Sequence, residues 1–107
     1  MKVLPSSMRL KRRYLRFKVI SPVKLTRREM ADAILSAGVS LFGDHGMSLI
    51  NLHLVEFDES SMTGIIRCNR DKVDEARAII ATVSSIKGEP AGIRVLRVSG
   101  TLKGVRR

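Results

Sequence analysis

The sequence predicts an α+β fold in which one antiparallel sheet of four strands is backed by two helices. Its 107 residues suffice for a single domain. Their apolar patterns follow the order strand, helix, strand, strand, helix, strand, with short connections between them. Short connections and the preferred handedness of crossovers turn this order into a ferredoxin-like βαββαβ sandwich.

The first strand is predicted over residues 14–20. Leu15, Phe17 and Val19 alternate there with polar side chains, which is typical of a strand with one buried face. Pro22 ends the strand because proline lacks a ladder donor. We therefore expect Phe17 in the core.

The first helix begins with a capping box formed by Thr26 and Glu29. Apolar residues then recur at helical spacing. They are Met30, Ala33, Ile34, Ala37 and Leu41. Gly43, Asp44 and Gly46 are expected to close this helix.

The next two strands are predicted as a hairpin. Residues 47–57 are rich in strand formers, 58–61 are polar, and 62–69 form the third strand. Asn69 or Asp71 is expected to cap the second helix.

The second helix carries an apolar stripe and ends before glycine and proline. The stripe consists of Val73, Ala76, Ile80 and Val83. Gly88 is expected to mark the helix end, and residues 93–101 to form the last strand.

The charge is unbalanced and unevenly distributed. Twenty Lys and Arg face ten Asp and Glu, a net charge of +10. Residues 1–24 hold eight bases and residues 94–107 hold five, and neither stretch holds an acid. A domain this basic usually has a polyanionic partner.

The predicted fold brings these two stretches together, because the last strand lies beside the first and antiparallel to it. We expect a basic arm over 1–12, one domain over 13–102 and a basic tail over 103–107. The candidate RNA-binding residues are Arg9, Lys11, Arg12, Arg13, Arg16, Lys18, Arg67, Arg97, Lys103, Arg106 and Arg107.

RNA is favoured over DNA as the polyanion. The second helix carries Asp74 and Glu75 near its start, where a groove-reading helix needs neutral or basic groups. Tyr14 is the one aromatic residue expected on the polar face of the first strand, and 62–69 holds none. Folded RNA, bound through shape and phosphates, therefore fits better than base-by-base reading of a single strand.

Catalytic and metal-binding patterns are weak. His45, His53 and Cys68 lack ligand spacing, and Cys68 in a strand is more often a buried apolar residue than a nucleophile. We expect no catalytic residue, no bound metal and no cofactor. A single cysteine and the lack of an apolar run of about 20 residues predict a cytoplasmic protein without a membrane span.

Apolar residues around the hairpin exceed what one sheet face needs. Ile50, Leu54, Phe57 and Met62 are therefore candidates for a protein interface. The alternative is that all four belong to the core.

Four segments of the chain form a recognisable set in their order and spacing. They are Arg13-Tyr14-Leu15, Leu41-Phe42-Gly43, Gly64-Ile65-Ile66-Arg67-Cys68 and the closing segment from Arg97 to Lys103. Together they resemble the family of ribonuclease P protein component 2, found in archaea and related to subunits of eukaryotic ribonuclease P and MRP.

The resemblance implies an RNA-binding-domain-like sandwich that helps a catalytic RNA remove the 5′ leader of precursor tRNA. It implies that Mg²⁺ is held by the RNA subunit, and that the partners are this RNA, precursor tRNA and protein component 3. Self-association is a further expectation. The alternatives are a generic structured-RNA-binding module and a small acylphosphatase-like hydrolase, which would need a phosphate-binding loop where Ser21-Pro22-Val23 stands.

Overall fold

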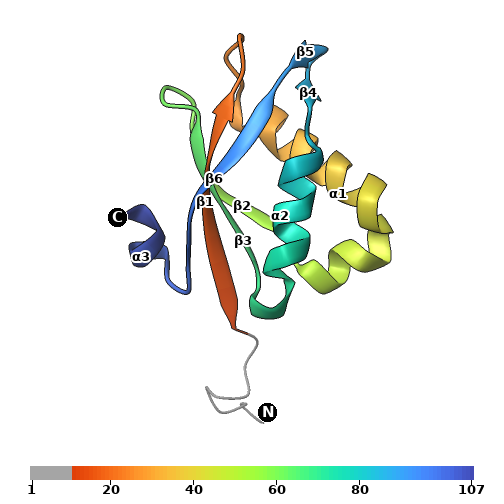
Figure 1. Ribbon diagram of the computed structural model, residues 1–107, viewed down its shortest axis with the longest axis vertical. Helices are drawn as coiled ribbons and strands as arrows, with labels where there is room; N and C mark the ends of the chain where they lie inside the picture. The colour runs from red at the N-terminus through yellow and green to blue at the C-terminus, as the bar shows by residue number, and fades with distance from the viewer. Residues whose placement is uncertain (1–10) are drawn as a thin grey trace.

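The first and last strands are neighbours in one antiparallel sheet, which confirms the predicted fold class. The computed structural model describes residues 11–107 and orders the strands β2-β3-β1-β6 (Figure 1). β1 pairs antiparallel with both β3 and β6, and β2 pairs antiparallel with β3. The strands are β1 (Arg12–Ile20), β2 (His53–Asp58), β3 (Thr63–Asn69) and β6 (Gly92–Ser99).

Helices lie on both sides of this sheet. α1 (Arg27–Ile50) and α2 (Val73–Thr82) lie on one side, and α3 (Leu102–Arg106) lies on the other (Figure 1). We call the side of α1 and α2 the helix face and the opposite side the outer face. A short 3₁₀ turn, η2 (Arg70–Lys72), precedes α2, and a small hairpin of β4 (Ser85–Ile86) and β5 (Glu89–Pro90) follows it.

The core fills the space between the sheet and α1 and α2. Leu15, Phe17 and Val19 of β1 are at most 3% exposed, which confirms their predicted phase. The Phe17 ring stacks on Phe57 with centroids 6.3 Å apart. A Cβ on Gly64 would lie 2.6 Å from the Phe17 ring, so only glycine lets the ring lie this close to β3.

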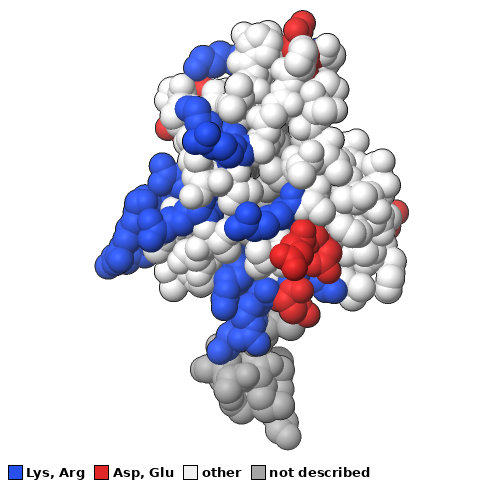
Figure 2. All heavy atoms as spheres, in the orientation of Figure 1, with Lys and Arg blue, Asp and Glu red and all other residues white. Residues whose placement is uncertain are grey.

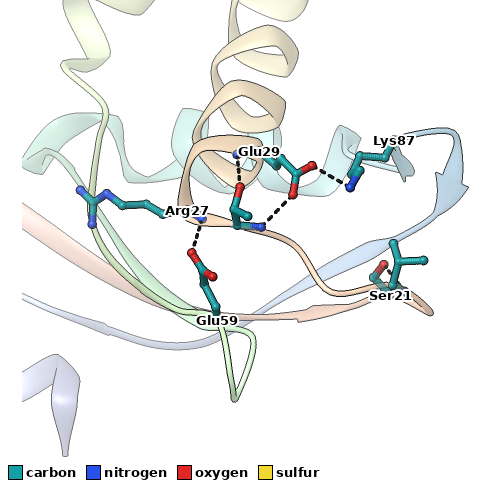
Figure 3. Close-up of polar contacts among 7 residues, drawn as sticks. Ser21, Arg27, Glu29, Glu59 and Lys87 are labelled. Atoms are coloured by element: carbon teal, nitrogen blue, oxygen red, sulfur yellow. Dashed lines mark hydrogen bonds and ion pairs between the residues drawn. The ribbon is translucent and has the colours of Figure 1, made fainter.

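The start of α1 is built as predicted (Figure 3). The Thr26 hydroxyl accepts from Glu29 N at 3.2 Å, and the Glu29 carboxylate accepts from Thr26 N at 2.9 Å. Lys87, in the β4-β5 turn, pairs with Glu29 at 2.7 Å. Glu59 accepts from Arg27 N at 3.0 Å, so the β2-β3 turn also holds this helix end.

The predicted end of this helix is wrong. Gly43 leaves helical geometry at φ 73, but the chain then resumes the helix as far as Ile50. The kink allows Ile50 to be buried at 2% exposure, and Asn51 ends the helix in a left-handed conformation. The strand expected from Met47 therefore starts only at His53.

The predicted caps of the second helix are also wrong. Neither η2 nor α2 has a side-chain cap. The Asn69 amide instead donates to Leu49 O at 2.9 Å and ties β3 to the end of α1. Gly88 does not end α2, which stops at Thr82; with Lys87 it forms the two-residue β4-β5 turn, where both residues have positive φ.

The residues expected to form a basic tail instead include a helix. Thr101 caps α3 by accepting from Gly104 N at 3.0 Å, and Val105 is fully buried. No sequence pattern predicted this helix, because a single buried turn leaves too short an apolar pattern to detect.

α1 is long and apolar enough to span a membrane by length and composition alone. Met30 and Ile34 of this helix are nevertheless part of the core cluster, and Gly43 kinks it. It is therefore the core helix of the sandwich.

β6 contains a bulge that decides which way its side chains point. Arg97 pairs with Arg16 and Val95 with Phe17, so Leu96 has no partner across the strands. A bulge inserts one residue and reverses the alternation beyond it. Arg94 and Arg97, three positions apart, consequently lie on the same face.

Candidate nucleic-acid interface

The outer face of the sheet carries two basic pairs that lie directly across β1 and β6. Arg16 pairs with Arg97, and Lys18 with Arg94. We call these four residues the basic ladder. Like charges directly opposite each other destabilise a sheet, so the ladder favours an anionic ligand between its members.

α3 packs over part of this outer face. Val105 is 0% and Ile65 4% exposed, yet neither belongs to the core cluster on the helix face. Val105 of α3 and Ile65 of β3 therefore belong to a small apolar region between α3 and the outer face. Gly104 fits closely against Ser99, because a Cβ there would overlap the Ser99 side chain.

Polar contacts also hold α3 on the ladder. Arg16 Nη1 donates to the Arg106 and Arg107 carbonyls at 3.5 and 3.4 Å, and Arg97 Nη1 donates to Arg107 O at 3.5 Å. Arg106 forms an ion pair with Glu56 of β2. The backbone carbonyls thus partly offset the charge of the ladder through long, weak hydrogen bonds.

A cleft of about 190 Å³ lies between α3 and β2. Its walls carry Arg16 and Arg106 on one side and Glu56 and Asp58 on the other. Hydrogen bonds from the Ser60 side chain and backbone lower the pKa of Asp58, so it stays ionised. Glu56 and Asp58 therefore place negative charge on the β2 side of this cleft, whereas the β1-β6 side is basic.

Basic and acidic side chains also separate on the face of the molecule that Figure 2 shows. Lys and Arg gather around α3 and along the start of β1, whereas acidic side chains gather near the start of α2 (Figure 2). Within residues 11–107, the basic groups of β1 and of β6 lie on neighbouring strands, because β1 pairs with β6.

Most predicted RNA-binding residues lie on this basic side. Arg16, Lys18, Arg67 and Arg97 lie on the outer face by register. Lys103 and Arg106 lie on α3, with Arg107 directly after it, and all three are exposed. Lys11 and Arg12 are exposed at the start of β1, and Arg9 lies outside the described residues.

Arg13 is the exception, because it alternates with Arg12 and lies on the helix face. It pairs with Cys68 across β1 and β3, and its guanidinium lies near Gly100. Arg94 is a member of the basic ladder that the sequence analysis did not include among the candidate RNA-binding residues. Simple alternation would place Arg94 and Arg97 on different faces of the sheet, and only the bulge at Leu96 places them on the same face.

Cys68 is fully buried in the core. Burial raises the pKa of its thiol to about 11, with smaller contributions from Glu75 and Asp71. The thiol is therefore protonated at neutral pH and is a poor nucleophile. No group of three metal-ligating side chains occurs within residues 11–107.

The predicted protein-interface residues lie mostly in the core. Ile50 is 2% and Met62 8% exposed, and Leu54 and Phe57 are half-buried against the core cluster. For Ile50 and Met62 the structure thus favours the alternative that they are core residues.

Exposed apolar side chains instead lie along α1. They are Leu35, Val39, Leu41 and Leu49, between 39% and 55% exposed. Beside Leu35, an apolar cleft of about 170 Å³ separates α1 from the start of β2. Leu35 and Val39 lie one helical turn apart on the same side of α1, so with this cleft they form a candidate protein-binding surface.

Comparisons with known proteins agree with this architecture. Residues 13–107 match the model of the Rpp14/Pop5 family. The chain is 42% identical to ribonuclease P protein component 2 of Pyrococcus furiosus over 99% of this chain and 88% of the relative. It is 40% identical to the protein of that name from Methanosarcina barkeri, over 96% and 75%.

A solved structure shows the same fold. A chain of yeast ribonuclease MRP, determined by cryo-electron microscopy, superposes with a TM-score of 0.72 at 17% identity, covering 89% of this chain and 78% of that chain. With a family model matched over nearly its whole length, this chain belongs to the Rpp14/Pop5 family.

Proposed function

We propose that this chain is the RNA-binding component 2 of ribonuclease P and assists the catalytic RNA in removing the 5′ leader of precursor tRNA. The family and the names of its relatives support the assignment. The observation that carries the RNA-binding role is the basic ladder, in which cross-strand pairs of like charge lie beside exposed bases of α3.

The protein's contribution is electrostatic. Folding a catalytic RNA brings phosphates close together, and each phosphate that a Lys or Arg neutralises releases condensed cations. Arginine suits this task because its planar guanidinium can bind phosphate through two hydrogen bonds. Under this proposal Mg²⁺ is held by the RNA, and the protein lowers the concentration of Mg²⁺ that the RNA needs.

The test is reconstituted cleavage of precursor tRNA by the RNA subunit, titrated with Mg²⁺ and with the variant Lys18→Gln/Arg94→Gln. We expect this variant to need more Mg²⁺ and its RNA affinity to depend less steeply on salt, by roughly one slope unit for each lost phosphate contact. Arg77→Gln is the matched control, because Arg77 is exposed on α2, which lies on the helix face.

Two results would contradict the proposal. One is reconstituted activity that is equal with and without this chain at every Mg²⁺ concentration. The other is equal affinity for the cognate RNA subunit and an unrelated folded RNA of the same length, which would favour a generic RNA-binding module.

We further propose that the exposed apolar side of α1 contacts protein component 3. Leu35 and Val39, on one side of α1, and the cleft beside Leu35 support this surface over the residues first predicted. Leu35→Glu should abolish co-elution with component 3, whereas Ile20→Glu, at an equally exposed apolar position on β1, should not. If the chain alone forms a dimer that Leu35→Glu dissociates, the surface serves self-association instead. A cytoplasmic location stays a prediction.

A further inference from the structure

Strand register aligns three residues with planar side chains in one row across the sheet, and His53, on the edge strand, also borders the cleft beside α1. Register places His53 of β2 opposite Arg67 of β3, and Arg67 opposite Tyr14 of β1. Residues directly opposite in a sheet point to the same face with Cβ atoms about 4.5–5.5 Å apart. We call Tyr14, Arg67 and His53 the planar row.

The row remains accessible beside α3. The polar contacts of α3 go to Arg16, Arg97 and Glu56. Arg16 is two positions from Tyr14 along β1, and Glu56 is three positions from His53 along β2. Arg97 is two positions from Ser99 along β6. Ser99, opposite Tyr14 on β6, is where Gly104 packs. α3 therefore bounds the row on the β6 side. His53 is exposed at the β2 end, and Tyr14 and Arg67 are half-buried.

Arg67 has no protein partner that would account for its charge. Within residues 11–107 the structure gives its side chain no ion pair or hydrogen bond, and its Nε is buried. The Nε of Arg67 is thus a donor without a partner, and register places the residue between Tyr14 and His53. An unpaired, planar guanidinium suits a nucleobase, on which arginine stacks and to which it donates hydrogen bonds.

His53 is held in place by a polar network. Its Nε2 lies 2.9 Å from Asn51 Oδ1, Asn51 Nδ2 lies 3.5 Å from Asn69 Oδ1, and Asn69 donates to Leu49 O. The network fixes one edge of the imidazole ring. A ring positioned in advance loses less conformational entropy when a ligand stacks on it.

Phosphate-binding groups flank the row. Arg12, two residues before Tyr14, lies on the same strand face and is exposed, and Arg70 is exposed just after β3. An RNA strand that crosses the row can place its nucleobases on the planar groups and its phosphates against Arg12 and Arg70.

We propose that Tyr14, Arg67 and His53 form a stacking site for unpaired nucleotides of RNA. The proposal rests on the RNA-binding function above and adds base contacts to it. Base stacking on β3 was not expected, because this strand holds no aromatic residue. The planar guanidinium of Arg67 takes the place of an aromatic ring there. Single-stranded RNA is the favoured ligand over a protein, because planar groups flanked by arginines suit nucleotides better than peptide side chains.

The experiment compares two short single-stranded oligonucleotides of equal length, one with bases and one abasic throughout, for binding to the full chain. We expect the first to bind more tightly, because both carry the same phosphates but only one can stack. Tyr14→Ala should weaken its binding roughly 5- to 100-fold, as expected for the loss of one stacked base. Binding of the abasic strand should stay unchanged.

Arg67→Lys and His53→Gln provide tests that preserve the fold. Arg67→Lys keeps the charge but removes the planar group, so it should weaken the base-bearing strand alone. His53 is exposed, so His53→Gln should do the same while the melting temperature stays at the wild-type value. Arg77→Lys, the matched control on the exposed surface of α2, should leave the preference for bases intact.

Equal binding of the two oligonucleotides would overturn the stacking site, as would a preference for bases that survives both Arg67→Lys and His53→Gln. Neither result affects the function proposed for the ladder, which is tested separately by the Mg²⁺ dependence of cleavage. Conversely, stacking by a chain that does not stimulate cleavage would contradict the ribonuclease P role alone.

Discussion

At the scale of single residues, close packing around Phe17 determines how β1 and β3 fit together. Phe17 is fully buried, stacks on Phe57 and lies against the backbone of Gly64. The alternation in residues 14–20 was enough to predict the burial of Phe17. The need for glycine at position 64 could not be predicted, because it arises from a contact between two strands.

Phe17→Ala should therefore lower the free energy of unfolding by about 3–5 kcal/mol, because it removes a large core side chain and leaves a cavity. Denaturant unfolding measures this change. Leu96→Ala, at a position 39% exposed, serves as a control and should change stability by about 0.5 kcal/mol or less. Equal effects of the two substitutions would show that the strand phase is wrong.

Gly64→Ala should destabilise the protein by about 1–3 kcal/mol, because the added methyl group would lie 2.6 Å from the Phe17 ring and 2.9 Å from Glu56 O. Gly92→Ala is the matched control, since nothing lies within 4 Å of a Cβ there. Thermal unfolding of both variants compares them. A melting temperature for Gly64→Ala equal to that of the control would contradict the close packing.

At the scale of elements, local signals predicted the start of α1 but not its end. A capping box involves four neighbouring residues, so Thr26 and Glu29 could be found in the sequence. The continuation past Gly43 depends on the burial of Ile50, and the position of α3 depends on the burial of Val105. Both are tertiary contacts, which no local pattern shows.

Glu29 should make stability depend on pH. A hydrogen bond from Lys87, followed by one from the Thr26 backbone, lowers the pKa of Glu29. A lowered pKa stabilises the folded state above the ordinary glutamate pKa, and this stabilisation is lost as pH falls through the folded value. Glu29→Gln should thus lower the melting temperature at about pH 7 but make little difference near pH 3. An equal difference at both pH values would contradict this coupling.

Gly104→Ala should loosen α3 on the sheet, because the new methyl group would displace the Ser99 and Thr101 hydroxyls. Amide hydrogen exchange measures the change, since Gly104 N and Val105 N are bonded to the Thr101 side chain and backbone. We expect these amides to lose protection while those of β1 keep it. Unchanged protection in α3 would show that the contact with Ser99 is not required.

At the scale of the whole molecule, strand order places the basic groups of β1 and of β6 on neighbouring strands, and this arrangement could be predicted from the sequence. The distribution of individual arginines between the two faces was predicted less well. Arg13 lies on the helix face, and Arg94 joins the ladder through a bulge that no sequence pattern announced.

Arg12→Ala and Arg13→Ala should therefore differ in their effect on RNA binding. Arg12 lies on the outer face, so its loss should weaken binding and reduce the salt slope by roughly one unit. Arg13 is partly buried and donates to Arg12 O at 3.1 Å, so its loss should affect the slope less. Affinity measured over a series of salt concentrations tests this difference. Equal slopes for the two variants would contradict the assignment of faces.

The bulge at Leu96 also has a consequence for comparing relatives. The bulge adds one residue to β6, so two basic residues an odd number of positions apart, here Arg94 and Arg97, can face the same ligand. Homologues with basic residues three positions apart in this strand must keep the bulge residue. Homologues that lack the bulge can keep both basic residues on one face only if one of them is shifted by one position. Insertions, deletions and basic positions in this strand should therefore change together during evolution.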